Sequence, residues 1–287
     1  MGNLSIKLRC NAGRLASSAL CASLVFISLA SIVPLPAAAS DYAREKRFAD
    51  EVTAQLVVGD AVSIPLPVGT SAGYRPFLGL YTAGKPGLPA VVLAHGVGTH
   101  PEDGLTGSLR LRLNDLGYTT LAIQMPIAAK EATVDDYYPA LFPEAGARLQ
   151  AASQWLKGKG HANIALVSHT FGSWMANVYL DNNLSKFTQG KGAQGTGTQD
   201  RPYHAWVCIS LTGGYSFAVR NYPFPVLDLY GENDIPVTVS SAWRRNGLLR
   251  LAATGSRQQM IAGADAQWRG KEQAAAQAIA DFLRVHF

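Results

Sequence analysis

One hydroxyl residue in this chain stands where a turn could make it a nucleophile. After the apolar run 164–167, the sequence places Ser168, Thr170 and Gly172 at alternate positions. A nucleophile on a tight strand-to-helix turn needs small residues two positions away on each side, because the strand and the helix come close together there. The spacing predicts a strand over 164–167, a tight turn at Thr170 and a helix beginning near Phe171.

Threonine is an unusual residue for the centre of such a turn. Its hydroxyl becomes a good nucleophile only when a neighbouring base takes its proton. Its branched Cβ is also disfavoured at the positive φ that this kind of turn requires. The preceding small position holds Ser168 where glycine is usual. The pattern therefore predicts that the turn is present and that its chemical centre is altered.

A glycine-containing turn after another apolar run offers a second feature of a site. Ala90–Ala94 is continuously apolar, which suits a strand buried on both faces, and His95, Gly96 and Val97 follow it. Backbone N–H groups in such a turn can face a developing oxyanion. We expect oxyanion donors at these three positions and at Phe171. The alternative is a tight turn in which His95 packs against the end of the strand.

Together with the later segments, these motifs resemble the alpha/beta-hydrolase superfamily. The resemblance extends from about Tyr74 to the C-terminus and is closest to an exported bacterial branch of hydrolase-like proteins. It implies an α/β protein with the alpha/beta-hydrolase fold. Strand and helix patterns alternate from Ala90 onward, which favours a mostly parallel central sheet with helices on both faces. Segments 62–67 and 74–81 predict an antiparallel N-terminal lead-in.

The pattern between the motifs predicts the remaining elements. They are a helix around Leu109, Leu113 and Leu116, a helix over 144–159 and others over 240–251 and 271–286, with strands over 119–125, 205–211, 225–231 and 258–262.

The resemblance also assigns the acid and base of a catalytic triad. In the family, the acid follows a late strand and the histidine follows the last one. Asp234 aligns with the acid, although it could instead cap a helix starting at Pro236. The base position aligns with Ala266, which cannot accept a proton. Without intact triad members only ~10³ to 10⁴-fold catalysis over water survives. The resemblance therefore implies little or no Ser-His-Asp turnover.

Two histidines near the motifs are candidate substitutes for the missing base. His169 precedes Thr170, but consecutive residues at a turn should point apart. His100 follows the oxyanion turn and is the better candidate. With Glu102 and Asp103 it could also form a metal site, but one imidazole and two acids are a weak donor set. We expect no metal and no other cofactor.

The aromatic residues divide into a predicted core and a predicted surface. Phe171, Trp174 and Met175 recur at helical spacing and are expected in the core. A group in the loop before the 144–159 helix is expected to form an exposed binding surface: Tyr137, Tyr138 and Phe142.

The first 39 residues have the features of an export signal. Lys7, Arg9 and Arg14 form a basic region without acids, an apolar run covers 19–33, and small residues lead to a cleavage position after Ala39. The apolar run is short for a membrane span. We expect cleavage, no membrane span afterwards, and a periplasmic or secreted protein.

Removing this leader changes the cysteine content and the charge. Cys10 and Cys21 leave with it, so Cys208, a predicted core residue, has no partner for an intramolecular disulfide. The whole chain carries a net charge of +5, and the leader contains three of the basic residues, which leaves about +2. This charge is too small to indicate nucleic acid as a partner.

Length and composition fit a single domain over 40–287. Within it, the polar, glycine-rich segment 188–200 is expected to be a mobile loop. We expect a pseudoenzyme with a degenerate triad, a non-catalytic or very weak hydrolase that binds an unknown ligand or protein partner. Two alternatives stay open: an active periplasmic esterase with Thr170 as nucleophile and an unidentified base, and an assembly factor that uses only its outer surface.

Overall fold

The computed structural model describes residues 40–66, 74–133, 140–185, 201–213 and 217–287. The chain divides into two compact units, 1–37 and 38–287, and every described residue belongs to the second. The predicted leader, the 188–200 loop and the surface residues Tyr137 and Tyr138 lie outside the described residues. In the part that is described, no helix combines the length and the apolar character needed to cross a membrane.

An eight-stranded sheet forms the centre of the unit, with the order β1-β2-β4-β3-β5-β6-β7-β8. β1 pairs antiparallel with β2, and β2 with β4, whereas the other neighbours pair in parallel. The predicted mostly parallel sheet with an antiparallel lead-in is therefore confirmed. The strands are β1 (Asp60–Ile64), β2 (Phe77–Thr82), β3 (Ala90–Ala94), β4 (Thr119–Ile123), β5 (Ile164–His169), β6 (Ala205–Ile209), β7 (Val226–Asn233) and β8 (Arg257–Asp265).

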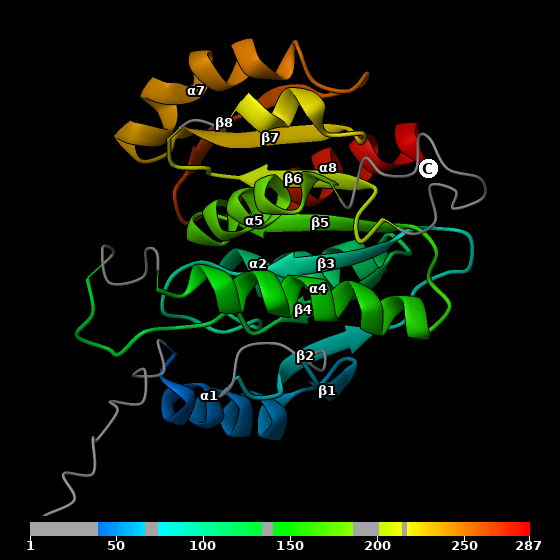
Figure 1. The fold of residues 1–287 in the computed structure, drawn as a ribbon, viewed down its shortest axis with the longest axis vertical. Helices are drawn as coiled ribbons and strands as arrows, with labels where there is room; N and C mark the ends of the chain where they lie inside the picture. The colour runs from blue at the N-terminus through cyan, green and yellow to red at the C-terminus, as the bar shows by residue number, and fades with distance from the viewer. Residues whose placement is uncertain (1–39, 67–73, 134–139, 186–200, 214–216) are drawn as a thin grey trace, which may run out of the picture. The chain divides into compact units, whose positions relative to one another are not determined.

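Helices cover both faces of this sheet, as Figure 1 shows. α4 and α5 pack on one face, and α2 and α8 pack on the other. The last turn of α7 joins the α4 and α5 side, and α1 lies beside β1 and β2. The helices are α1 (Tyr42–Gln55), α2 (Gly104–Asp115), α4 (Phe142–Gly158), α5 (Phe171–Asn182), α7 (Pro236–Leu249) and α8 (Glu272–His286), with a 3₁₀ helix η3 (Phe217–Asn221) before β7.

The central strands are apolar on both faces because both faces are covered. In β3, Val92 contributes to the core under α4 and α5, whereas Val91 and Leu93 contribute to the core under α2 and α8. Successive side chains of a strand point to opposite faces, so a strand covered twice reads as one continuous apolar run. Each such side chain, fully buried, stabilises the fold by roughly 1.5–3 kcal/mol.

Some element boundaries differ from the sequence prediction. α7 begins at Pro236, four residues before the predicted start, because proline suits the first turn of a helix. α2 buries Leu105, Leu109 and Leu113 and ends at Asp115, so Leu116 is exposed and does not extend the apolar face as predicted. β8 extends to Asp265 because its pairing with β7 continues past an irregularity.

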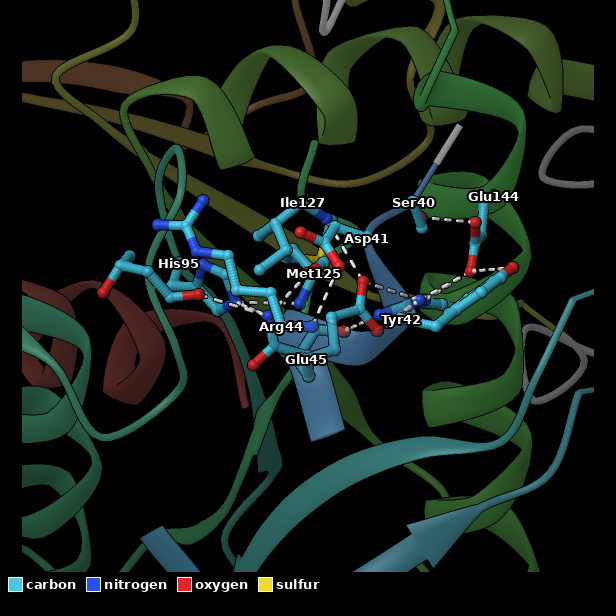
Figure 2. A network of polar contacts seen from close by, with 12 residues as sticks. Ser40, Asp41, Tyr42, Arg44, Glu45, His95, Met125, Ile127 and Glu144 are labelled. Atoms are coloured by element: carbon cyan, nitrogen blue, oxygen red, sulfur yellow. Dashed lines mark hydrogen bonds and ion pairs between the residues drawn. The ribbon is translucent and has the colours of Figure 1, made fainter. Parts of the chain in front are cut away.

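A buried ion cluster ties α1 to α4. The guanidinium of Arg148 lies 2.8 Å from Oε2 of Glu45 and 2.5 Å from Oε1 of Glu144. Arg148 also donates to the carbonyl oxygen of Gln124 at 3.0 Å, beyond the end of β4. Figure 2 shows both carboxylates between the start of α1 and the first turns of α4. Three elements distant in sequence are held by one side chain that is fully buried.

We predict that Arg148→Met lowers the free energy of unfolding by about 3–5 kcal/mol, because two buried carboxylates lose their cation. The matched control is Arg284→Gln on α8, where an exposed ion pair with Asp281 is lost. That change should cost about 1 kcal/mol or less. Urea unfolding of both variants gives the comparison. Equal losses would show that Arg148 is not a structural anchor.

Candidate functional site

The predicted turn between strand and helix is formed by Thr170 alone. β5 ends at His169 and α5 begins at Phe171. Thr170 has φ 50° and ψ −115°, a conformation that costs roughly 1–3 kcal/mol outside glycine. Its N–H donates to the carbonyl oxygen of Ile209 at 2.8 Å, and its own carbonyl accepts from the N–H of Ser173 at 3.0 Å. Threonine thus occupies the positive φ that its branched side chain disfavours, held by these bonds.

Two glycines let β3 approach this turn. A Cβ added to Gly172 would lie 2.3 Å from the carbonyl oxygen of His95. A Cβ added to Gly96 would lie 2.4 Å from Oγ1 of Thr170 but 3.7 Å from its Cβ. A side chain at Gly172 would therefore collide with the backbone of His95, whereas one at Gly96 would displace the hydroxyl of Thr170, which is directed at Gly96.

The imidazole of His95 has a structural role in the loop after β3. Its Nε2 accepts from the N–H of Met125 at 2.9 Å, so the proton is on Nδ1, which donates to the carbonyl oxygen of Gly96 at 2.8 Å. Burial lowers the pKa of His95 to about 3. The ring is neutral at ordinary pH and joins the loop to the end of β4. Val97, in contrast, is exposed beside the site.

Asp234, aligned with the triad acid, is buried and fully engaged. Its Oδ2 accepts from the hydroxyl of Ser210 and from the N–H of Gly231, and its Oδ1 accepts from the N–H of Ile235 at 2.8 Å. Ser210 in turn accepts from Nε1 of Trp268 at 2.9 Å. The alternative prediction was that Asp234 caps α7. Its only bond at that helix start is the one from the N–H of Ile235, because α7 has no side-chain cap bond.

A single pocket of about 740 Å³ opens over the turn. Thr170, Gly96, Val97 and Ala266 all line it. The structure therefore brings the predicted nucleophile, oxyanion and base positions to one cavity. Four predicted residues are not in its lining: His95, His100, Asp234 and Phe171. Phe171 begins α5, and its ring packs 5.5 Å from those of Phe142 and Trp174.

His169 also lines this pocket, beside Thr170. The two consecutive side chains share one cavity because the turn begins directly after His169. Its Nε2 is buried and has no hydrogen-bond partner among the described residues. Burial lowers the pKa of His169 to about 4, while the charge of Asp234 and the backbone of Ala266 act in the opposite direction. This imidazole thus lies close to the predicted acid and base positions, Asp234 and Ala266.

His100, the predicted substitute base, is not in the pocket lining. Its ring lies 5.1 Å from that of Phe48 on α1. Its two predicted metal-binding neighbours have other partners: Glu102 forms an ion pair with Arg110 at 2.7 Å, and Asp103 accepts from the hydroxyl of Thr99. Among the described side chains, no group of three or more His, Cys, Asp and Glu could hold a metal ion.

One aromatic prediction is wrong and others are confirmed. Phe142 is buried at the start of α4, where it contacts the rings of Phe171 and Trp174, so it does not form an exposed binding surface. Phe171 and Met175 are core residues, as predicted, and Cys208 is a fully buried core residue of β6.

The sequence did not predict the roles of Ser210 and of the fully buried Trp268. Both have positive φ, 53° and 60°, although neither is glycine. Nothing in the local sequence signals this, because the contact between them joins the ends of β6 and β8. The rule that consecutive residues at a turn point apart gives His169 little weight as a substitute base.

Solved structures that resemble this chain include hydrolases and esterases. The dienelactone hydrolase from Anabaena variabilis has a TM-score of 0.57 and 18% identity, covering 79% of this chain and 98% of that chain. Est1E from Butyrivibrio proteoclasticus has a TM-score of 0.55 and 13% identity, covering 79% and 98%. An esterase from Pyrobaculum calidifontis has a TM-score of 0.55 and 16% identity, covering 85% and 93%.

At these identities the likeness shows the fold, and the chain has the alpha/beta-hydrolase fold. No protein-family model and no curated protein matches it in sequence.

We predict that Gly172→Ala destabilises the protein by several kcal/mol, because the new methyl group would collide with the backbone of His95. The matched control is Gly247→Ala on α7, where a Cβ meets no atom within 4 Å. The control should be neutral or stabilise by up to about 1 kcal/mol, since alanine is the better helix former. Thermal unfolding distinguishes the two, and a tolerated Gly172→Ala would contradict the close approach.

Proposed function

We propose that this alpha/beta-hydrolase-fold protein is exported and acts by binding a ligand in the pocket over Thr170, with ester hydrolysis that is very weak or absent. It acts in the periplasm or after secretion, with the leader removed. The observation that carries the proposal is the engagement of Asp234 by Ser210 and two backbone N–H groups.

A triad acid works by accepting the Nδ1–H of the base histidine, which fixes its tautomer and stabilises the imidazolium. In this protein both carboxylate oxygens of Asp234 already accept from protein donors. Through Ser210, the carboxylate holds Trp268 in the turn after β8. The acid therefore supports the loop that would carry a base.

The base and nucleophile positions support the same conclusion. Ala266 lines the pocket and brings only a methyl group. The hydroxyl of Thr170 is directed at Gly96, within the turn that would supply oxyanion donors. A hydroxyl without a base stays protonated and is a weak nucleophile.

The pocket lining indicates the class of ligand. It presents hydroxyl, amide and charged groups of both signs, from Thr99, Ser108, Gln267, Arg269 and Glu272. A few convergent polar groups in a concave site fix the orientation of small polar molecules. We infer a small polar ligand, with a protein partner at the rim as the other possibility.

We predict that the wild-type chain 40–287 hydrolyses short-chain activated esters no faster than Thr170→Ala does. The restored variant Thr170→Ser/Ala266→His/Ser210→Gly should gain turnover, because it supplies a nucleophile and a base and frees Asp234. Glycine at position 210 suits the φ of 53° found there.

The double variant Thr170→Ser/Ala266→His, which keeps Ser210, is the matched control and should gain less than the triple variant. Wild-type turnover that disappears in Thr170→Ala would contradict the binding proposal and favour an active hydrolase.

His169 favours a second candidate function, an active esterase with Thr170 as nucleophile. The imidazole shares the pocket with Thr170, is influenced by Asp234, and has a buried Nε2 with no hydrogen-bond partner in the described part of the chain. A neutral imidazole can accept the hydroxyl proton directly or through one water molecule. His169 would then replace the base that Ala266 lacks.

This second candidate predicts an unusual pH profile. A base must be neutral to accept a proton, and the pKa of His169 is lowered to about 4. Turnover should therefore be constant near neutral pH and fall as the pH drops toward 4, rather than near the ordinary histidine value of about 6.5. His169→Gln should abolish turnover, whereas His100→Gln, the control outside the pocket, should preserve it. An acidic limb near pH 6.5 would argue against His169.

A further inference from the structure

The buried ion cluster between α1 and α4 contains more negative than positive charge. Glu45 and Glu144 share the single guanidinium of Arg148, and all three side chains are buried. An uncompensated buried charge costs several kcal/mol, so a third partner is expected.

The nearby arginines in the described part of the structure do not supply this charge. Arg44 donates to the carbonyl oxygens of Gly98 and Ala128. Arg75 lies over the ring of Tyr42, 4.9 Å from its centroid. Tyr42 donates its hydroxyl to Glu144 at 3.2 Å, but this bond adds no positive charge.

Ser40 lies directly against the excess carboxylate. Its hydroxyl donates to Oε2 of Glu144 at 2.6 Å, and its side chain is almost fully buried. Figure 2 shows this contact beside the bond from Tyr42. The N–H of Asp41 donates to the carbonyl oxygen of Ile127 at 2.7 Å, which fixes the chain at this point.

Covalent geometry places the backbone nitrogen of Ser40 near the same carboxylate. The nitrogen and Oγ of a serine are separated by three bonds and so by less than about 4 Å. The nitrogen of Ser40 is therefore on the order of 6 Å or less from Glu144.

We propose that removal of the leader after Ala39 turns the nitrogen of Ser40 into an ammonium group that forms a buried ion pair with Glu144 and neutralises the cluster. This inference rests on the export part of the proposed function. Hydrolysis by a signal-peptidase-type enzyme adds one water molecule across the Ala39–Ser40 peptide bond. Ala39 receives a carboxyl group, and Ser40 becomes an amine that takes up a proton from solvent.

In the uncleaved chain the same nitrogen is a neutral amide. It brings no positive charge to the cluster, where burial raises the pKa of Glu45 and the charge of Glu144 adds to this effect. Leader removal therefore changes the stability of the domain, and the mature form is the more stable one.

The experiment compares chain 40–287 with a free or an acetylated amino terminus, each with Glu144 or with Glu144→Gln. The chain can be tested alone because residues 38–287 form a compact unit. With Glu144 present, acetylation should lower the folding equilibrium constant at pH 6.5 about tenfold or more, which equals a shift of one pKa unit. With Glu144→Gln, acetylation should have little effect.

The pH dependence has a defined sign. An amine that gains a carboxylate partner on folding has a raised pKa in the folded state. Its stabilisation is fully present below the unfolded value of about 7.7–8.0 and is lost as the pH rises through the folded value. The described charged and titratable groups around Ser40 are Glu144 and Arg148 on α4, Asp41, Tyr42, Arg44 and Glu45 at the start of α1, and Arg75.

The acetylated chain should lack this alkaline loss. Titration of the amino terminus by NMR gives an independent readout, expected at least one unit above about 7.7–8.0. Equal stability of the free and acetylated chains, or an unshifted amine, would overturn the ion pair. N-terminal sequencing of the exported protein tests cleavage separately, and a start other than Ser40 would overturn the proposed maturation. Neither measurement depends on ester turnover.

Discussion

The contact between the end of β3 and the start of α5 determines the geometry of the candidate site. Gly172 faces the carbonyl oxygen of His95 with no room for a Cβ, and Gly96 faces the side-chain hydroxyl of Thr170. With strand and helix this close, the chain must reverse within one residue, and that residue takes a positive φ. The pocket opens over this turn because the turn lies at the carboxyl edge of a parallel sheet, where ligand sites of open α/β folds are found.

Hydrogen bonds between the ends of neighbouring strands hold three strained residues together. Thr170 donates its N–H to the carbonyl oxygen of Ile209 at the end of β6. Ser210, which follows Ile209, donates its hydroxyl to Asp234 after β7 and accepts from Trp268 after β8. Thr170, Ser210 and Trp268 all have positive φ without being glycine. Such conformations persist only where the surroundings over-determine them. Asp234 is central to this arrangement, so its carboxylate has a structural role in these loops.

The sequence predicted the fold well because its signals are local. Continuous apolar runs such as Ala90–Ala94 require burial on two faces, and their alternation with helical patterns leaves few topologies. The turns at Gly96 and Thr170 were predicted for the same reason, because each residue lies a few positions after an apolar run. The burial of Phe142 and the shared pocket of His169 and Thr170 depend on contacts between distant segments. Patterns within one segment contain no information about them.

Strain at Thr170 is a poor guide to activity in this protein. Backbone strain at a strand-to-helix turn is often associated with a nucleophile, but here the glycine contacts and the bond to Ile209 account for it whether or not the hydroxyl reacts. The engaged state of Asp234 argues against a triad, because its carboxylate already accepts three hydrogen bonds, from Ser210 and from two backbone N–H groups. The buried, unpartnered Nε2 of His169 argues the other way, since leaving such an atom unbonded costs about 1–3 kcal/mol. Since this nitrogen is itself buried, a ligand in the pocket could bond it only after neighbouring atoms move aside.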